Sequence, residues 1–162
     1  MEQLNQLRKV DWTNIKTHIF LFLPATLGLA ASIACKLKNT GKNIETRPSN
    51  VVFSLSWLWI YISLGLVWNL LRPFNSYIID ILMLYNTFLL ILWVILYGCL
   101  KRRKEAFYVL LKTYVISLGI FGYSWSHSDI AGALTTVYVG WMTYMLLLNY
   151  NEVNLEKHKH KK

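Results

Sequence analysis

The sequence lacks the short motifs that mark most enzymes. It contains no catalytic triad, phosphate-binding loop or pair of carboxylates. Its two cysteines, Cys35 and Cys99, do not have CxxC spacing, and two histidines in a cationic tail, His158 and His160, are weak metal ligands. We therefore expect no metal site and no required cofactor. Of the functions that the sequence leaves open, we consider enzymatic activity the weakest.

Polar sequence is also scarce. The chain is 55% hydrophobic, and a water-soluble domain could not bury that much apolar sequence. A membrane-spanning helix needs about 20 mostly apolar residues. Five stretches come close to that length: 18–35, 51–71, 77–100, 106–125 and 130–149.

The sequence thus predicts an all-α integral membrane protein, with a five-transmembrane-helix bundle over residues 18–150. The polar segment 1–17 precedes the bundle and is a candidate for a short interfacial helix. Its polar residues are unlike the start of a secretory signal, so no cleavable signal peptide is predicted. A basic tail, 151–162, follows the bundle.

The net charge of +9 is distributed unequally between the two faces that five spans create. Four Lys and Arg residues fall on the face with the N-terminus, and twelve fall on the other. The positive-inside rule then predicts an external N-terminus and a cytosolic C-terminus. Each basic cluster adjoins a span, so we assign the charge to topology and membrane lipid rather than nucleic acid. Cys35 and Cys99 lie at the predicted cytosolic face, where we expect free, reduced thiols.

Three tryptophans lie inside different predicted spans at nearly one depth. Trp57, Trp93 and Trp141 are roughly 9–12 Å from the basic face, at about 1.5 Å per helical residue. Tryptophan normally prefers the membrane–water interface, so an internal layer of indoles indicates a packed core or an aromatic pocket. A separate interfacial belt is predicted at the opposite face: Trp12, Trp68 and Trp125.

Large residues recur at helical spacing around the three indoles. They form three stripes: Phe53, Trp57 and Tyr61; Trp93, Tyr97 and Leu100; and Tyr138, Trp141, Met145 and Leu148. Ordinary packing against helices or lipid explains such stripes. The alternative is a cavity, because membrane helices usually associate through small residues and a ring of large aromatics holds them apart.

These residues bring the chain close to a known family. The run from Val52 to Gly65 resembles the second helix of the translocator protein / tryptophan-rich sensory protein (TspO/MBR) family. Tyr138-x-x-Trp141, followed by Leu148-Asn149, resembles its fifth helix, and Trp93 to Tyr97 resembles the end of its third. The sequence departs from the family pattern at two prolines, which are replaced by Leu55 and Val137.

The resemblance implies a bundle with an aromatic cavity in its cytosolic half that binds porphyrins (tetrapyrroles), sterols or other flat hydrophobic ligands, in a sensing or transport role. Some relatives degrade porphyrins in light, and Trp57 and Trp141 match the tryptophans proposed to take part. The family's cholesterol pattern fails by one residue between Tyr150 and Lys157, which favours porphyrin over sterol. Carried over by position, the ligand-binding residues are Phe53, Trp57, Tyr61, Trp93, Tyr138, Trp141, Met145, Leu148 and Asn149.

Lys112 is the clear cation inside a predicted span. Snorkelling to the nearby membrane surface explains it, and the alternative is a pocket cation that meets a ligand carboxylate. A small transporter or scaffold is the remaining alternative function, although few polar groups lie at mid-membrane for an ion-coupled carrier. A homodimer also stays open, because Gly28-x-x-x-Ser32 permits close helix contact.

Overall fold

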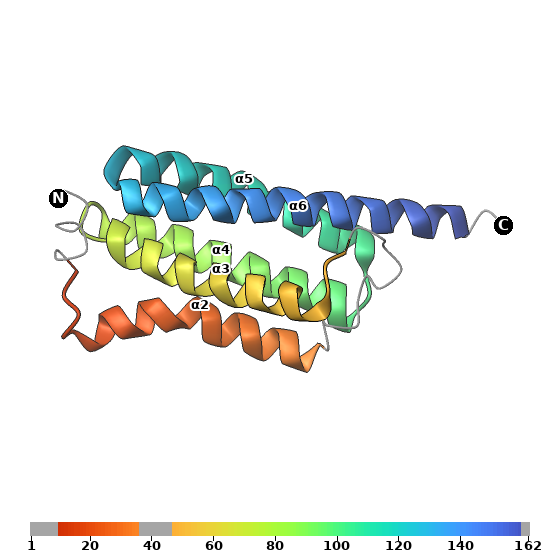
Figure 1. The fold of residues 1–162 in the computed structure, drawn as a ribbon, viewed down its shortest axis with the longest axis horizontal. Coiled ribbons are helices and arrows are strands. Elements are labelled where there is room, and N and C mark those ends of the chain that lie inside the picture. Colours follow the sequence, from red (N-terminus) through yellow and green to blue (C-terminus); the bar gives the residue numbers. More distant parts are fainter. Residues whose placement is uncertain (1–9, 36–46, 160–162) are drawn as a thin grey trace.

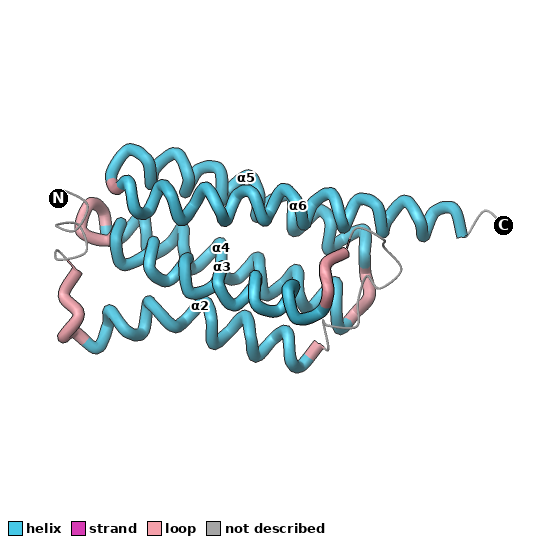
Figure 2. Tube along the Cα trace, in the orientation of Figure 1, coloured by secondary structure: helices cyan, strands magenta, loops and turns pink. Residues whose placement is uncertain are grey.

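The computed structural model describes residues 10–35 and 47–159, the last five without their side chains. All regular structure in these ranges is helical (Figure 2). The elements are α2 (Ile15–Ala34), α3 (Asn50–Leu71), α4 (Ser76–Val94), the π-helical turn η2 (Ile95–Cys99), α5 (Arg103–His127) and α6 (Asp129–Lys159).

Five helices are long and apolar enough to cross a membrane, with α4 and η2 forming one of them, as the sequence predicts. A helix satisfies its own backbone hydrogen bonds, which a bilayer requires. Three short polar side chains cap helix starts: Asn14 accepts from Lys16 N at 2.9 Å, Ser49 from Val52 N, and Asn75 from Ile78 N. The first span begins at Ile15, three residues earlier than predicted, because the Asn14 cap lies upstream of the apolar run.

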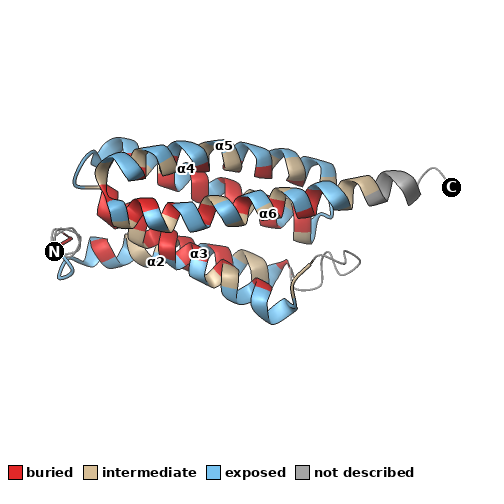
Figure 3. Cartoon of the chain, turned by 45° about the horizontal axis from the view of Figure 1, so that its top comes forward, coloured by how far each residue is buried: buried red, intermediate tan, exposed pale blue. Residues whose placement is uncertain are grey.

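Successive helices run in alternating directions, so the start of α2 and the end of α6 lie at opposite ends of the bundle (Figure 1). We call the end that holds Cys35, Asn50, Cys99 and Arg103 the basic end. Helix α3 is central, with twelve of its 22 residues buried, whereas α2 is peripheral, with four of 20. Residues on the outer faces are exposed and mostly apolar, as expected for contact with lipid (Figure 3).

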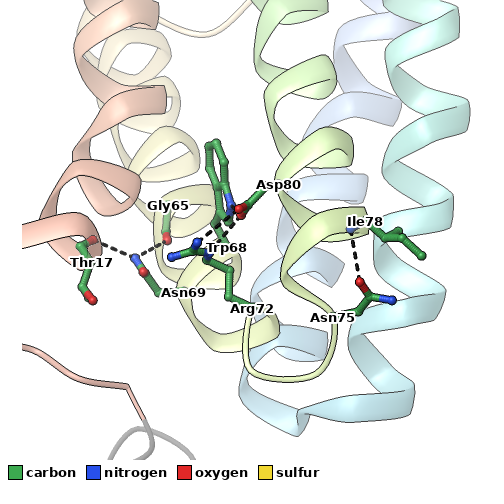
Figure 4. A network of polar contacts seen from close by, with 8 residues as sticks. All are labelled: Thr17, Gly65, Trp68, Asn69, Arg72, Asn75, Ile78 and Asp80. Carbon is green, nitrogen blue, oxygen red and sulfur yellow. Dashed lines mark hydrogen bonds and ion pairs between the residues drawn. The ribbon is translucent and has the colours of Figure 1, made fainter. Parts of the chain in front are cut away.

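The end opposite the basic end is joined by a polar network between α2, α3 and α4 (Figure 4). The Arg72 guanidinium pairs with the Asp80 carboxylate at 3.0 Å, and the Trp68 indole N–H donates to Asp80 at 2.6 Å. The Asn69 amide donates to the Thr17 carbonyl at 3.0 Å. Trp68 is fully buried, so the prediction that it belongs to an interfacial belt is wrong. Its ring is buried between the helices, and its indole N–H donates to the partly exposed Asp80 carboxylate.

The expectation of free thiols is also wrong. Cys35, at the end of α2, forms a disulfide with Cys99, at the end of η2, and their Cα atoms are 4.6 Å apart. The two cysteines are 64 residues apart in sequence, and only the packing of α2 against the end of the α4–η2 span brings them together. Spacing in the sequence carries no information on such a pairing.

Helix α6 continues past the bundle into the segment predicted as a tail, and it ends at Lys159 (Figure 1). An ion pair between Glu152 and Arg103, 3.8 Å apart, holds the first turn of this extension against the start of α5. The candidate interfacial helix falls mostly on residues 1–9, outside the described part. The His158 and His160 side chains also lie outside it.

Candidate functional site: an aromatic cluster beside a lateral groove

The three tryptophans predicted at one depth meet in the interior of the basic half. The Trp57 ring stacks on Trp93 with centroids 5.3 Å apart, and it meets Trp141 edge-to-face at 6.1 Å. Trp57 and Trp93 are 4% and 0% exposed, and Trp141 is half-buried. The indoles therefore converge as predicted, and their rings are in contact between α3, α4 and α6. We call these three residues with Phe53 the aromatic cluster.

Phe53 completes the cluster at its basic end, with its ring 6.4 Å from Trp57 and 6.2 Å from Trp141. Tyr61 extends it toward mid-membrane, 5.4 Å from Trp57. All nine residues predicted to bind ligand are buried or half-buried on the inner faces of their helices. The other four predicted residues are buried beside the cluster: Tyr138, Met145, Leu148 and Asn149.

Two buried hydrogen bonds cross between α4 and α6. The Trp93 indole N–H donates to the Asn149 side-chain oxygen at 3.3 Å, and the Asn149 amide donates to the Met145 carbonyl. The Tyr138 hydroxyl donates to the Asn86 side-chain oxygen at 3.0 Å. Asn86 is fully buried and was not singled out from the sequence, although a lone Asn within an apolar span is the signal that marks it. Both bonds fix the rotation of α6 against α4.

The π-helical turn η2 explains why one predicted stripe breaks. Tyr97 lies inside the bundle and stacks on Trp93 at 5.2 Å, whereas Leu100 is exposed. The Leu100 backbone N–H donates to the carbonyl of Ile95, five residues back, so this hydrogen bond encloses one residue more than the bond of an α-helix. That extra residue rotates Leu100 off the Trp93 face.

Two of the cluster's indole N–H groups have no acceptor within the part of the chain that the structure describes. They belong to Trp57 and Trp141, and both nitrogens are buried. A buried donor without an acceptor costs free energy, about 1–3 kcal/mol, so such groups are rare in native structures and require an explanation. An acceptor atom supplied by a bound molecule is one such explanation, because both donors belong to the same cluster.

A groove of about 300 Å³ lies between α3 and α6, with Trp141 as one wall. Trp59 and Val137 are 56% and 54% exposed, and both lie well inside their spans, so the groove opens sideways toward lipid. No atom lies within 4 Å of the position that a Gly140 side chain would take. Sequence analysis missed most of the groove because its residues are spread over both helices: Ser56, Trp59, Ile60, Val137, Gly140, Trp141 and Tyr144.

Charged side chains gather where the cluster meets the basic end. The Arg47 guanidinium lies over the Phe53 ring at 4.9 Å, and that of Arg103 lies over Tyr97 at 4.3 Å. Arg103 also donates to the Tyr97 carbonyl and pairs with Glu152. Arginine at the rim of an aromatic site attracts anionic groups, whereas the aromatic rings below accept flat apolar ones.

The TspO/MBR family model matches residues 17–153, which is most of the chain and includes every residue of the cluster. The chain belongs to the TspO/MBR family. No curated protein matches it. This TspO/MBR protein is accordingly an integral, multi-pass membrane protein of a sensory or transport type.

The two residues that replace family prolines in this TspO/MBR protein both lie on the outer surface of the bundle. Leu55 is 59% exposed on α3, and Val137 is 54% exposed at the groove. Lys112 is exposed on α5 and does not belong to the cluster or to the groove lining. Its position therefore supports snorkelling, and the pocket interpretation of Lys112 lacks structural support. Gly28 packs against the Tyr61 ring within the chain, so this small-residue position serves an internal contact.

Proposed function

We propose that this TspO/MBR protein binds flat hydrophobic molecules, with a porphyrin as the favoured ligand, in the groove between α3 and α6. The indole N–H of Trp141, a buried donor on a groove residue that lacks an acceptor in the described structure, carries the proposal. The Trp57 N–H also lacks an acceptor there, and its ring contacts Trp141 without lining the groove. A tetrapyrrole offers nitrogen and carbonyl acceptors together with a broad face that stacks on indole.

The shape and chemistry of the groove support the same ligand class. Its volume of about 300 Å³ falls at the lower end of the range for small-molecule sites. Aromatic side chains from both helices line it: Trp59, Trp141 and Tyr144. A flat ring system makes more contact with such walls than a branched aliphatic molecule of equal volume. Binding there fits a sensing or transport role, since the ligand enters and leaves without crossing the polar ends.

The test fills the groove and leaves the fold alone. Gly140→Leu places a side chain into open space in the groove, so it should weaken binding of protoporphyrin by about 1–3 kcal/mol, the scale of forced overpacking. Tryptophan quenching in detergent micelles measures the affinity.

Gly119→Leu is the matched control, because its side chain also enters open space but lies on α5, away from the groove. It should leave the affinity within about twofold of the original. Equal weakening by both variants, or by neither, would reject the groove as the binding site. Illuminating the complex during the titration also tests the photochemical alternative, because degradation would bleach the porphyrin absorption.

A further inference from the structure

Helix α2 is attached to the bundle unevenly along its length. Its buried residues all fall between Thr17 and Gly28. In that part the Asn69 amide donates to the Thr17 carbonyl, and the α2 backbone crosses α3 closely at Gly65. Residues 29–34, by contrast, are all exposed or half-buried. The attachment of this last part of α2 therefore depends largely on the disulfide that follows it.

Cys99 has the surroundings of a reactive thiol. It is exposed at the end of η2, whereas Cys35 is only 7% exposed. Four basic residues, 101–104, follow Cys99, and the chain there folds back on η2, since the Arg103 guanidinium donates to the Tyr97 carbonyl. Positive charge near a thiol stabilises the thiolate, which is the form that reacts.

Cys35 supplies the second thiol of a pair. The Cα atoms of Cys35 and Cys99 are 4.6 Å apart, so an oxidised Cys99 sulfur has a partner within bonding reach. An exposed thiol beside a second one is the arrangement that reversible redox-sensing cysteines share. The positive-inside rule places this end of the bundle in the cytosol, where thiols stay reduced until an oxidant arrives.

We propose that Cys99 and Cys35 form a peroxide-responsive switch, in which oxidation fastens the last part of α2 to η2 and reduction releases it. The structure describes the oxidised, fastened state. The switch goes beyond the proposed ligand site and does not depend on it, because neither cysteine belongs to the groove or to the aromatic cluster.

The chemistry takes two steps. The Cys99 thiolate attacks one oxygen of hydrogen peroxide, so that an S–O bond forms, the O–O bond breaks, and the hydroxide that leaves takes up a proton to become water. The Cys35 thiol then attacks the Cys99 sulfur, the S–S bond forms, and the S–O bond breaks with loss of a second water. The two thiols together lose two electrons, which reduce the peroxide. A small thiol reverses the change by exchange, and it is itself oxidised to its disulfide.

Single-cysteine variants test which sulfur meets the oxidant. Reduced Cys35→Ser protein treated with hydrogen peroxide should retain a sulfenic acid at Cys99, which dimedone traps and mass spectrometry locates. Cys99→Ser should give much less trapping, because the remaining Cys35 is buried. Equal trapping in the two variants, or none at Cys99, would reject Cys99 as the reacting residue.

The unchanged protein in membrane vesicles tests reversibility, because Cys35 and Cys99 are its only cysteines. After treatment with a small thiol, denaturation and a polymer-linked maleimide should add two polymer chains. Peroxide treatment should reduce this number to none, and a second thiol treatment should restore it. A bond that the small thiol cannot open in the folded protein is a permanent structural disulfide and would overturn the switch. So would thiols that peroxide leaves unpaired.

Hydrogen exchange in detergent micelles tests the release of α2. Reduction should speed amide exchange in residues 29–34 by roughly tenfold or more, the scale expected when a tethering disulfide is lost from a locally unfolding segment. Residues 17–28 are the internal control and should keep their protection, because their contacts with α3 do not involve the disulfide. The double variant Cys35→Ser/Cys99→Ser should match the reduced protein and ignore peroxide. Equal exchange of residues 29–34 in the oxidised and reduced proteins would show that the bond does not hold α2.

Discussion

At the scale of single residues, α2 and α3 approach so closely that only glycine fits at their crossing. A methyl group at Gly65 would lie 1.9 Å from the Leu21 carbonyl oxygen, and one at Gly28 would overlap the Tyr61 ring. Backbone atoms cannot move aside as a flexible side chain can, so Gly65 is the stricter of the two positions. Close backbone approach is how helices associate in lipid, where both surfaces are equally apolar.

We predict that Gly65→Ala destabilises the protein by about 1–3 kcal/mol, because the extra methyl group forces α2 away from α3. Gly122→Ala should cause no loss, since no atom lies within 4 Å of its new methyl group. Thermal unfolding in detergent, followed by tryptophan fluorescence, measures both variants. Equal stability of the two would mean that α2 does not cross α3 at Gly65.

At the scale of elements, the π-helical turn η2 has two consequences at once. It points Tyr97 inward onto Trp93, and it ends at Cys99, which is bonded to the end of α2. The disulfide therefore fixes the peripheral helix to the same turn that supports the aromatic cluster. The disulfide and the indole stack are thus both in direct contact with η2, through Cys99 and through Tyr97.

We predict that this bond holds two halves of the chain together after cleavage. A protease site placed in the turn between α3 and α4, at Phe74, separates Cys35 from Cys99 along the chain. Purified, cleaved protein should run as one band on a non-reducing gel and as two after reduction. A Cys99→Ser version should give two bands without reductant. Two bands from the version with both cysteines, without reductant, would contradict the pairing.

Much of this arrangement could be predicted from the sequence, and the failures share one cause. The depth of Trp57, Trp93 and Trp141 follows from counting residues along a helix, and that prediction was confirmed by their ring contacts. The rotation of a helix about its own axis does not follow from such counting. One extra residue in η2 was enough to put Leu100 outside.

Contacts between distant segments were invisible for a related reason. Trp68 was placed in an interfacial belt because it lies near the end of a span. In the structure its indole N–H donates to Asp80 on the next helix, a contact that the sequence does not indicate. The groove likewise depends on the relative position of α3 and α6, which neither helix specifies alone. The family resemblance predicts a ligand site in the half of the bundle that holds the aromatic cluster, and the groove beside Trp141 could not be predicted from it.

At the scale of the whole molecule, the charge distribution and the disulfide predict opposite locations for the basic end. Twelve basic residues on this face against four on the other predict that it is cytosolic. Disulfides persist mainly in oxidising compartments, and Cys35–Cys99 lies at this face. The positive-inside rule acts when the spans insert, so we expect it to determine the orientation. We expect the redox state of the compartment to determine whether the disulfide forms.

We predict that a cysteine placed at residue 159, in a background without Cys35 and Cys99, is labelled by a membrane-impermeant reagent from the cytosolic side only. A cysteine placed at Trp12 serves as the control and should be labelled from the outer side only. The reverse pattern would place the basic end outside, where the disulfide is expected, and would overturn the charge-based orientation.

The sideways opening of the groove has a consequence for how affinity is measured. A molecule that reaches the site between Trp59 and Val137 arrives from the hydrocarbon phase, so the relevant concentration is its mole fraction in the bilayer. Doubling the lipid at constant total ligand dilutes that mole fraction and halves occupancy in the unsaturated range. A dissociation constant expressed as a concentration in buffer then depends on the partition coefficient of the ligand as much as on its affinity for the protein. The affinities of variants are comparable only at an equal lipid-to-protein ratio.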